Sequence, residues 1–310
     1  MKIVALAGGV GGAKLADGLA QILSPADLTV IVNTGDDFEH FGLTICPDLD
    51  TVCYTLAGLA NPETGWGRTG ETQQALTGIQ LLGGPTWFRL GDRDLGTHLE
   101  RTRRLQAGDS LSSITADFCR AWGILPRVLP MSDQAVRTIV NTDEGELAFQ
   151  HYFVQRACEP KVKGFRFTGQ EKAEPAPGAL DAIEFADLVV LCPSNPWVSI
   201  APILAIGPLR AALAGKKTVA VSPIIGGKAV KGPAAKMFTE LGIQPSALAV
   251  AQYYGSLLSG FVLDETDAAQ ATAIRELGIM PLVAATLMQN REDRARLAQQ
   301  VVDFGASLST

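Results

Sequence analysis

The segment that most constrains the fold is a short apolar run followed at once by a glycine-rich turn. Residues 3–7 read Ile-Val-Ala-Leu-Ala, and residues 8–15 read Gly-Gly-Val-Gly-Gly-Ala-Lys-Leu. A strand that leads through glycines into a helix is typical of the first unit of an α/β sheet. Because glycine lacks a Cβ, backbone N–H groups can approach an anion at the positive end of a helix that we expect to begin near Gly12. The segment therefore predicts a phosphate site with these members: Gly9, Gly11, Gly12 and Lys14.

This loop matches neither of the two common nucleotide-binding motifs. The P-loop of ATPases needs Gly-Lys followed by Ser or Thr, whereas Ala13 precedes Lys14 and Leu15 follows it. The dinucleotide fingerprint needs a glycine where Lys14 stands and an acidic residue where Asn33 ends the second strand. A standard ATPase and an ordinary NAD-binding protein are both disfavoured, and a strand-to-helix turn without a ligand is the structural alternative.

Composition narrows the class of protein. A net charge of -6 argues against a general nucleic-acid binder, which needs a basic face. The five cysteines include no Cys-x-x-Cys pair, and no apolar run approaches the roughly 20 residues that span a bilayer. We expect a cytoplasmic protein with reduced thiols and no membrane partner.

The pattern of apolar runs predicts a single domain over residues 1–310 with an α/β, Rossmann-like, three-layer fold and a mostly parallel sheet. We expect its core at about 1–60 and 180–310, and an inserted helical and β-hairpin region at about 61–179. The expected strands are 3–7, 28–33, 87–90, 136–140, 147–153, 187–192, 218–222 and 280–283. The expected helices are 13–23, 48–59, 72–82, 95–105, 111–122, 203–213 and 291–304.

Two neighbouring carboxylates follow the second expected strand. Asp36 and Asp37 come just after Asn33 and Thr34, at the carboxyl edge where open α/β sheets bind ligands, and Asn33 and Thr34 are candidate substrate-binding residues there. Paired carboxylates suit Mg²⁺, which prefers oxygen ligands and often bridges carboxylates to substrate phosphates. The alternative is an Asp-rich turn that caps the next segment.

Two further acids begin the next expected helix. Asp48 could cap this helix, and Asp50 lies in its first turn, near the positive end of the helix dipole. Capping explains only one of them. The second acid favours metal ligation or activation of an attacking hydroxyl, and Asp50 is the better candidate for substrate contact.

Other polar loops follow expected strands. Arg89 ends strand 87–90 and could hold an acidic ligand group, although a solvated, salt-bridged turn explains it equally well. Ser194 and Asn195 follow strand 187–192 between two prolines and offer hydrogen bonds to a base, ribose or phosphate, with a purely structural turn as the alternative.

A second loop that contains glycines and a lysine favours an extended phosphate ligand. It follows strand 218–222, and a basic solvated loop is the alternative. Its candidate ligand residues are Gly226, Gly227 and Lys228. The three histidines show neither a triad spacing nor a metal motif, so each is treated as structural: His40, His98 and His151.

Taken together, these motifs closely resemble the CofD family of 2-phospho-L-lactate transferases. They occur in order across most of the chain, which makes the resemblance far more specific than any single loop. The motifs lie at residues 8–15, 33–37, 48–51, 91–94, 130–133, 193–196 and 222–228.

The resemblance implies a Mg²⁺-dependent homodimeric enzyme of coenzyme F-420 biosynthesis. Its acceptor would be the deazaflavin 7,8-didemethyl-8-hydroxy-5-deazariboflavin, called Fo, and its donor a guanosine diphosphate ester such as lactyl-2-diphospho-5'-guanosine. The acid could be lactate, enolpyruvate or glycerate, and GMP would be released. In this interpretation Asp36, Asp37 and Asp48 hold Mg²⁺, Asp37 also assists catalysis, Asp50 orients or deprotonates the hydroxyl, and Arg89 contacts Fo. Lys14 and Lys228 would bind phosphates.

A related branch offers an alternative of a different class. Part of the same motif set would also occur in non-catalytic regulators of cell-wall metabolism that bind nucleotide sugars or NAD. The continued match through residues 65–67, 87–89 and 151–155 favours the transferase, because these aromatic and polar stretches resemble its acceptor side.

Overall fold

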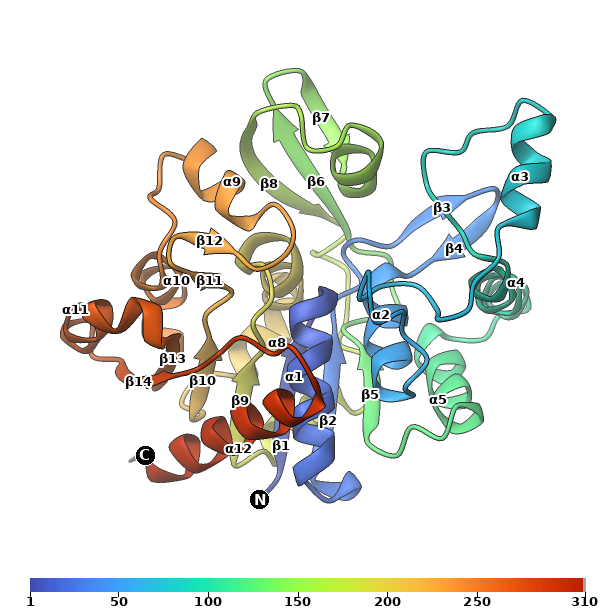
Figure 1. The fold of residues 1–310 in the computed structure, drawn as a ribbon. Helices are drawn as coiled ribbons and strands as arrows, with labels where there is room; N and C mark the ends of the chain where they lie inside the picture. The colour runs from blue at the N-terminus through green and yellow to red at the C-terminus, as the bar shows by residue number, and fades with distance from the viewer. Residues whose placement is uncertain (309–310) are drawn as a thin grey trace.

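The computed structural model describes residues 1–308, and its frame is a seven-stranded parallel sheet (Figure 1). The strand order is β14-β13-β10-β9-β1-β2-β5. The strands are β1 (Ile3–Ala7), β2 (Leu28–Val32), β5 (Arg127–Pro130), β9 (Leu188–Leu191), β10 (Thr218–Val221), β13 (Gly260–Asp264) and β14 (Met280–Ala284). The chain first runs outward from β1 to β5 and then places β9 on the other side of β1, so the topological switch point lies between β1 and β9. The predicted Rossmann-like α/β fold is confirmed.

Helices cover both faces of this sheet. One face carries α1 (Gly9–Ile22), α2 (Pro47–Leu56), α5 (Leu111–Ala121) and α12 (Arg291–Ser307); the other carries α6 (Ala179–Glu184), α7 (Ala201–Ala205), α8 (Gly207–Ala212) and α10 (Ala247–Tyr254). Ile3 and Ala5 of β1 pack in the hydrophobic core under α1 and α12, whereas Val4 and Leu6 pack in the core on the opposite face, under α7 and α10. Because both faces are buried, the strand is apolar along its whole length.

The remaining elements gather beyond the carboxyl ends of the parallel strands, in the upper half of Figure 1, or at the sides of the molecule. They include the hairpin β3 (Phe38–His40) and β4 (Leu43–Ile45), α3 (Gln74–Leu81), α4 (Asp92–Gln106), the sheet of β6 (Arg137–Thr142), β7 (Gly145–Ala148) and β8 (Val162–Thr168), the hairpin β11 (Ile224–Ile225) and β12 (Lys228–Ala229), α9 (Ala234–Glu240) and α11 (Ala271–Glu276). None of the helices within residues 1–308 has the length and apolar character needed to cross a membrane.

Two expected strands of the inserted region are wrong. Residues 87–88 form a bend and residues 89–90 have no regular structure. The rings of Trp87 and Phe88 pack on Phe38 and His40, while the backbone pairs with no strand in the described chain. The expected strand 147–153 ends at Ala148, and His151–Gln155 forms a helical turn. The apolar residues 149, 152 and 153 have helical rather than alternating spacing, which accounts for the difference.

Three further boundaries differ from expectation. The expected helix 203–213 is two helices, α7 and α8, separated at Ile206 because Pro208 starts a new first turn. Helix α1 begins at Gly9 rather than near Gly12. Strand β5 lies within the expected insertion of residues 61–179, yet it pairs with β2 as the edge of the core sheet, so a core strand divides that insertion.

Helix α1 packs so closely on α12 that Gly18 has no room for a side chain. A Cβ there would overlap the carbonyl oxygen of Arg294. We expect Gly18→Ala to lower the free energy of unfolding by about 3 kcal/mol, since two backbones would have to separate. Gly96→Ala in α4 is the control: apart from its own helix backbone and chain neighbours, no atom within residues 1–308 lies within 4 Å of its added Cβ, so a gain of about 0.5–1 kcal/mol is expected. Urea unfolding measures both, and equal effects would contradict the tight α1–α12 contact.

Candidate active site

Two loops touch at the switch point between β1 and β9. The Gly8 N–H donates to Ser194 Oγ at 3.2 Å, and this hydroxyl donates to the Gly8 carbonyl oxygen at 2.8 Å. A Cβ on Gly11 would overlap the Pro193 carbonyl oxygen, and one on Gly12 would lie 2.5 Å from Ser194 Oγ. Packing between the loops therefore requires both glycines, whether or not they also bind phosphate.

Gly9 differs from its neighbours because it is not crowded. Its φ is +62°, a value that favours glycine, and the nearest atom to an added Cβ is Asp48 Oδ1 at 3.9 Å. The start of α1 is thus open toward an acidic residue of α2. The predicted phosphate role of Gly9 stays a prediction.

Three carboxylates are buried together next to this loop. Asp36 and Asp37 follow β2, and Asp48 comes from the first turn of α2, where Cys46 rather than Asp48 is the N-cap residue. Asn33 Nδ2 donates to Asp48 Oδ2 at 2.9 Å and to the Val198 carbonyl oxygen at 3.0 Å, which fixes Asp48 against the neighbouring loop. Within residues 1–308, Asp36 Oδ1 and Asp37 Oδ1 are buried without a hydrogen-bond partner.

Burial makes this cluster costly to ionise. Burial raises the pKa of Asp36 well above its usual range, and the charges of Asp48 and Asp37 raise it further. Burial also raises the pKa of Asp37 to about 7, against the opposing charge of Arg137, and that of Asp48 to about 6. Buried carboxylate oxygens without donors are the ligands that a hard divalent cation prefers. The chemistry of these side chains therefore suits a Mg²⁺ ion, although Asp36, Asp37 and Asp48 do not bring one oxygen each within 4.8 Å of one another in this structure.

Thr34 shares the turn with these acids. Its side chain is buried, and its Oγ1 has no hydrogen-bond partner among the described residues, while its carbonyl oxygen accepts from Arg137 Nη1 at 3.4 Å. Arg137 is a residue that the sequence analysis did not single out. It enters from β6 and brings a positive charge to the side of Asp37.

Asp50 is engaged elsewhere. Its Oδ2 accepts from Arg101 Nη1 at 3.0 Å, its Oδ1 accepts from Arg101 Nη2, and His98 Nδ1 lies 3.7 Å from Oδ2. Arg101 is buried to 1% exposure on α4. The structure therefore assigns Asp50 to an ion pair with α4, beside rather than within the cluster of Asp36, Asp37 and Asp48. The sequence analysis missed Arg101, although residues 94, 98 and 101 share the spacing of one helix face.

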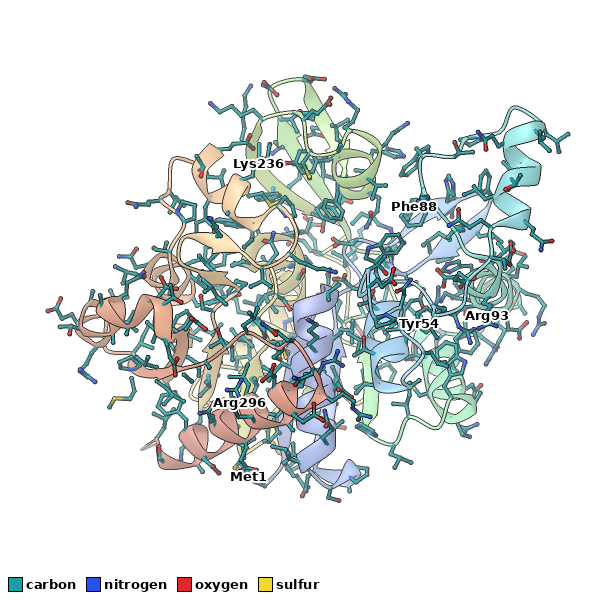
Figure 2. All side chains as sticks on the ribbon, viewed as in Figure 1. Met1, Tyr54, Phe88, Arg93, Lys236 and Arg296 are labelled. Atoms are coloured by element: carbon teal, nitrogen blue, oxygen red, sulfur yellow. The ribbon has the colours of Figure 1, made fainter. Side chains whose placement is uncertain are left out.

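Arg89 directly follows Trp87 and Phe88, whose rings pack on the β3–β4 hairpin. Arg89 is exposed, and its Nη2 donates to Gln73 Oε1 at 2.9 Å. The Phe38 and Phe88 ring centroids are 4.8 Å apart, and those of His40 and Trp87 are 5.1 Å apart. Figure 2 shows Phe88 beside this hairpin. These residues make a group of aromatic rings on the hairpin, and the guanidinium of the neighbouring residue Arg89 is held by Gln73.

His40 is the second residue that the sequence analysis undervalued. Its ring belongs to this aromatic group, its side chain is buried, and its Nε2 has no hydrogen-bond partner within residues 1–308. Burial and the nearby His151 lower the pKa of His40. A buried ring nitrogen without a partner is able to bind the polar edge of a ligand. The expectation that His40 is only structural therefore has an alternative, in which its Nε2 binds a ligand.

Lys14 sits on α1 in a basic environment. Its Nζ donates to the Met288 carbonyl oxygen at 2.7 Å. Burial lowers the pKa of Lys14, as do the charges of Arg294 and Lys231. Lys231 also contacts the Thr64 carbonyl oxygen. Lys14 and Lys231 together suit an anion, and Lys231 is an addition to the expected set, whereas the charge of Arg294 is already paired with Asp17.

The other expected ligand residues have clear structural roles. Asn195 Oδ1 accepts from the Trp197 and Val198 N–H groups and so caps the helical turn Pro196–Ile200. Gly226 and Gly227 form the two-residue turn of the β11–β12 hairpin, with φ values of +55° and +75° that explain both glycines. Lys228 is exposed on β12. Their predicted contacts with a diphosphate stay predictions.

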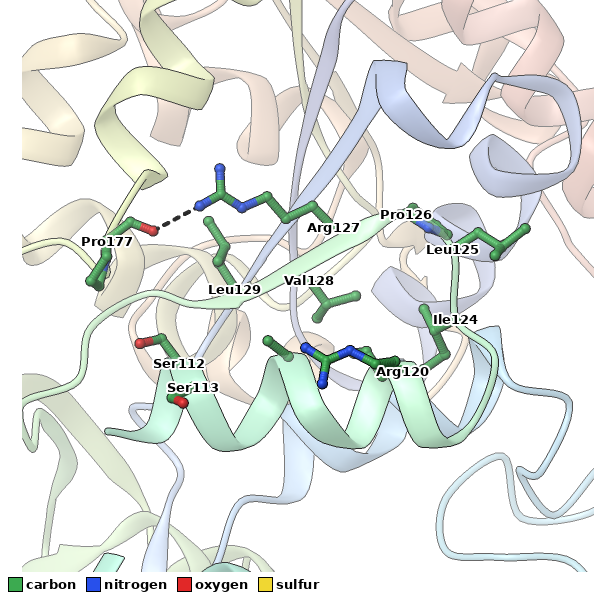
Figure 3. Close-up of a pocket in the computed structure, with 12 residues that line it drawn as sticks. Ser112, Ser113, Arg120, Ile124, Leu125, Pro126, Arg127, Val128, Leu129 and Pro177 are labelled. Carbon is green, nitrogen blue, oxygen red and sulfur yellow. Dashed lines mark hydrogen bonds between the residues drawn. The ribbon is translucent and has the colours of Figure 1, made fainter. Parts of the chain in front are cut away.

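A separate hollow of about 500 Å³ lies between α5 and β5 (Figure 3). Its lining is mostly apolar, and none of its lining residues is acidic. Arg127 crosses one end of it and donates to the Pro177 carbonyl oxygen at 3.0 Å. The hollow therefore contributes nothing to the carboxylate cluster.

Comparison with known proteins shows which family and which fold the chain resembles. The model of the family described as 2-phospho-L-lactate transferase CofD matches residues 3–300. A phosphoenolpyruvate transferase of Streptomyces griseus subsp. griseus is 45% identical and covers 98% of both chains. A 2-phospho-L-lactate transferase of Methanosarcina mazei is 39% identical and covers 97% of this chain and 99% of its own. A crystal structure of a UPF0052 family member from Bacillus halodurans has the same fold, with a TM-score of 0.63, 16% identity, and coverage of 97% of this chain and 99% of its own.

Proposed function

This chain belongs to the CofD family of 2-phospho-L-lactate transferases, and we propose that it moves a phospho-linked three-carbon acid from a guanosine diphosphate ester to Fo. The observation that carries the proposal is the buried cluster of Asp36, Asp37 and Asp48 at the switch point of the sheet. We expect an enolpyruvyl donor first, because a relative with 45% identity is a phosphoenolpyruvate transferase, and a lactyl donor second.

The acidic cluster is where the donor diphosphate would be held. Mg²⁺ bound by Asp36, Asp37 and Asp48 would neutralise charge on the diphosphate. Asn33 supports this arrangement because its amide holds Asp48 in place. Lys14, together with the start of α1 at Gly9, would bind phosphate oxygens on the adjacent side through charge-assisted hydrogen bonds.

The acceptor would approach from the side of the β3–β4 hairpin. The rings of Phe38, Trp87 and Phe88 offer a surface for a planar deazaflavin, and Arg89 stands next to them. Asp50 would orient the terminal ribityl hydroxyl and accept its proton as the new bond forms. Most of the rate enhancement would then come from positioning and charge neutralisation.

The transfer is a displacement at one phosphorus atom. The ribityl oxygen forms a bond to the phosphorus that bears the acid, the bond from that phosphorus to the bridging oxygen breaks, and GMP leaves with the electron pair. The hydroxyl proton passes to a carboxylate at the site. The step requires no covalent intermediate with the enzyme.

A turnover assay tests the proposal. Purified protein is incubated with Fo, Mg²⁺ and, in separate reactions, the enolpyruvyl, lactyl and glyceryl esters of guanosine diphosphate, and mass spectrometry detects Fo carrying a phospho-acid together with GMP. Product with the enolpyruvyl donor at the highest rate is expected. Absence of product with every donor, combined with binding of NAD or a nucleotide sugar, would instead identify a regulator.

We propose in addition that the chain acts as a homodimer in the cytoplasm, as the family resemblance implies. Leu81 and Leu82 at the end of α3 are 84% and 89% exposed, and apolar side chains of this kind are suited to contact a second copy. Sedimentation velocity measures the oligomeric state. A monomer at every concentration would contradict it.

A further inference from the structure

The buried contact between α2 and α4 is made by charged side chains. Both terminal nitrogens of Arg101 contact Asp50, with Nη1 donating to Oδ2 at 3.0 Å and Nη2 donating to Oδ1. The same Nη1 lies 3.2 Å from His98 Nδ1 and 3.4 Å from the carbonyl oxygen of Thr44, to which it donates. The planar guanidinium of Arg101 holds the Asp50 carboxylate at two points and is itself held by other groups. The carboxylate therefore has little freedom to rotate.

A second contact lies one turn further along α2 and two turns nearer the start of α4. Tyr54 of α2 donates its hydroxyl to Asp94 Oδ1 of α4 at 2.6 Å, and His98 Nε2 lies 3.4 Å from Asp94 Oδ2. Asp94, His98 and Arg101 share one face of α4, while Asp50 and Tyr54 share one face of α2. The two helices are thus fixed to each other at both contacts, and Asp50 is held between them.

Stability alone gives little reason for this network. A buried ion pair must recover the cost of removing both charges from water, and apolar side chains of similar size often stabilise as well or better. Asp50, Asp94 and His98 are close enough to share a metal ion, but Arg101 already binds both oxygens of Asp50. Burial alone would lower the pKa of Arg101, but the Asp50 carboxylate raises that pKa above its usual range. Arg101 therefore stays positively charged. What the network supplies is a fixed position for one carboxylate.

We propose that Arg101 is a positioning residue for the transfer reaction, which holds the Asp50 carboxylate in the orientation that meets the acceptor hydroxyl. This inference rests on the proposed function, in which Asp50 contacts the acceptor. The inference adds Arg101 to the residues that serve this function. Arg101 lies 51 positions from Asp50 in the sequence, on a helix that supplies none of the expected ligand residues.

The test compares Arg101→Gln and Arg101→Lys with the control Arg104→Gln. Arg104 lies on the same helix but pairs with Asp109 and Asp117. We expect Arg101→Gln to lower kcat by about a hundredfold while the KM for the donor stays within about threefold. Arg101→Lys should be intermediate, because an ammonium keeps the charge but contacts the carboxylate as a point. Arg104→Gln should match the wild type in kcat.

Crystal structures of the variants give a readout that does not depend on turnover. The Asp50 carboxylate should rotate or adopt two conformers in Arg101→Gln and stay in place in Arg104→Gln; if the Gln variant fails to fold, Arg101→Lys takes its place in both measurements. Wild-type kcat in the Arg101 variants, or an unmoved Asp50, would overturn the inference. If the wild-type protein turns over none of the donors, the proposed function has failed, and the position of Asp50 in the crystals still decides whether Arg101 orients it.

Discussion

Asp36→Asn is expected to abolish transferase activity and, at the same time, to stabilise the protein. Asp36 is buried to 5% exposure next to Asp37 and Asp48, and its Oδ1 has no partner within residues 1–308. Removing this charge relieves burial and repulsion, so the metal-free protein should gain about 2 kcal/mol at pH 8. With Asp36 as a Mg²⁺ ligand, as we propose, its loss should lower kcat by about a thousandfold or more.

An equally buried carboxylate elsewhere provides the matched control. Asp17 is buried to 4% exposure and pairs with Arg291 and Arg294. Asp17→Asn should therefore lower stability, where Asp36→Asn raises it, and should leave kcat unchanged, where Asp36→Asn lowers it. Urea unfolding in EDTA and steady-state kinetics across a Mg²⁺ titration measure both variants. Unchanged Mg²⁺ dependence in Asp36→Asn would exclude Asp36 as a ligand.

The sheet and its ligand-binding edge could be predicted because their signals are local. Strands β1 and β2 are continuous apolar runs, and the residues that follow them in the chain must lie at the carboxyl edge of a parallel sheet. Strand β13 was missed because its apolar run is only three residues, Phe-Val-Leu, between Gly260 and Asp264, whereas the run of β1 fills all five positions. Periodicity is informative only over longer segments.

The partners of the site residues could not be predicted, because they depend on contacts between distant segments. Nothing near Asp50 in the sequence indicates that Arg101 binds it, and the aromatic group around His40 combines residues from β3 and from the bend at 87–88. Gly226 and Gly227 show a different limit. A glycine pair after a strand has the same sequence in a hairpin turn as in a phosphate loop, and only the pairing of β11 with β12 distinguishes them.

The fall of stability with rising pH should disappear when Mg²⁺ saturates the site. Asp37 and Asp48 have pKa values raised from 3.8 to about 7 and about 6, chiefly by burial. Between about pH 4 and 7 the metal-free native protein therefore keeps protons that the unfolded chain has released, so its free energy of unfolding falls as the pH rises, by a few kcal/mol in total. Mg²⁺ competes with these protons, so its stabilising effect should grow over the same range.

Two measurements follow from this competition. Thermal unfolding in EDTA and in saturating Mg²⁺ should give curves that separate as the pH rises, and calorimetry in two buffers of different ionisation enthalpy should show protons released when Mg²⁺ binds near pH 6. Asp37→Asn should flatten the metal-free curve, whereas the exposed Glu276→Gln should leave it unchanged. Parallel curves with no proton release would show that these carboxylates are ionised without a metal. Groups of the protein itself would then have to stabilise these negative charges. The physical argument for a cation among Asp36, Asp37 and Asp48 would no longer hold.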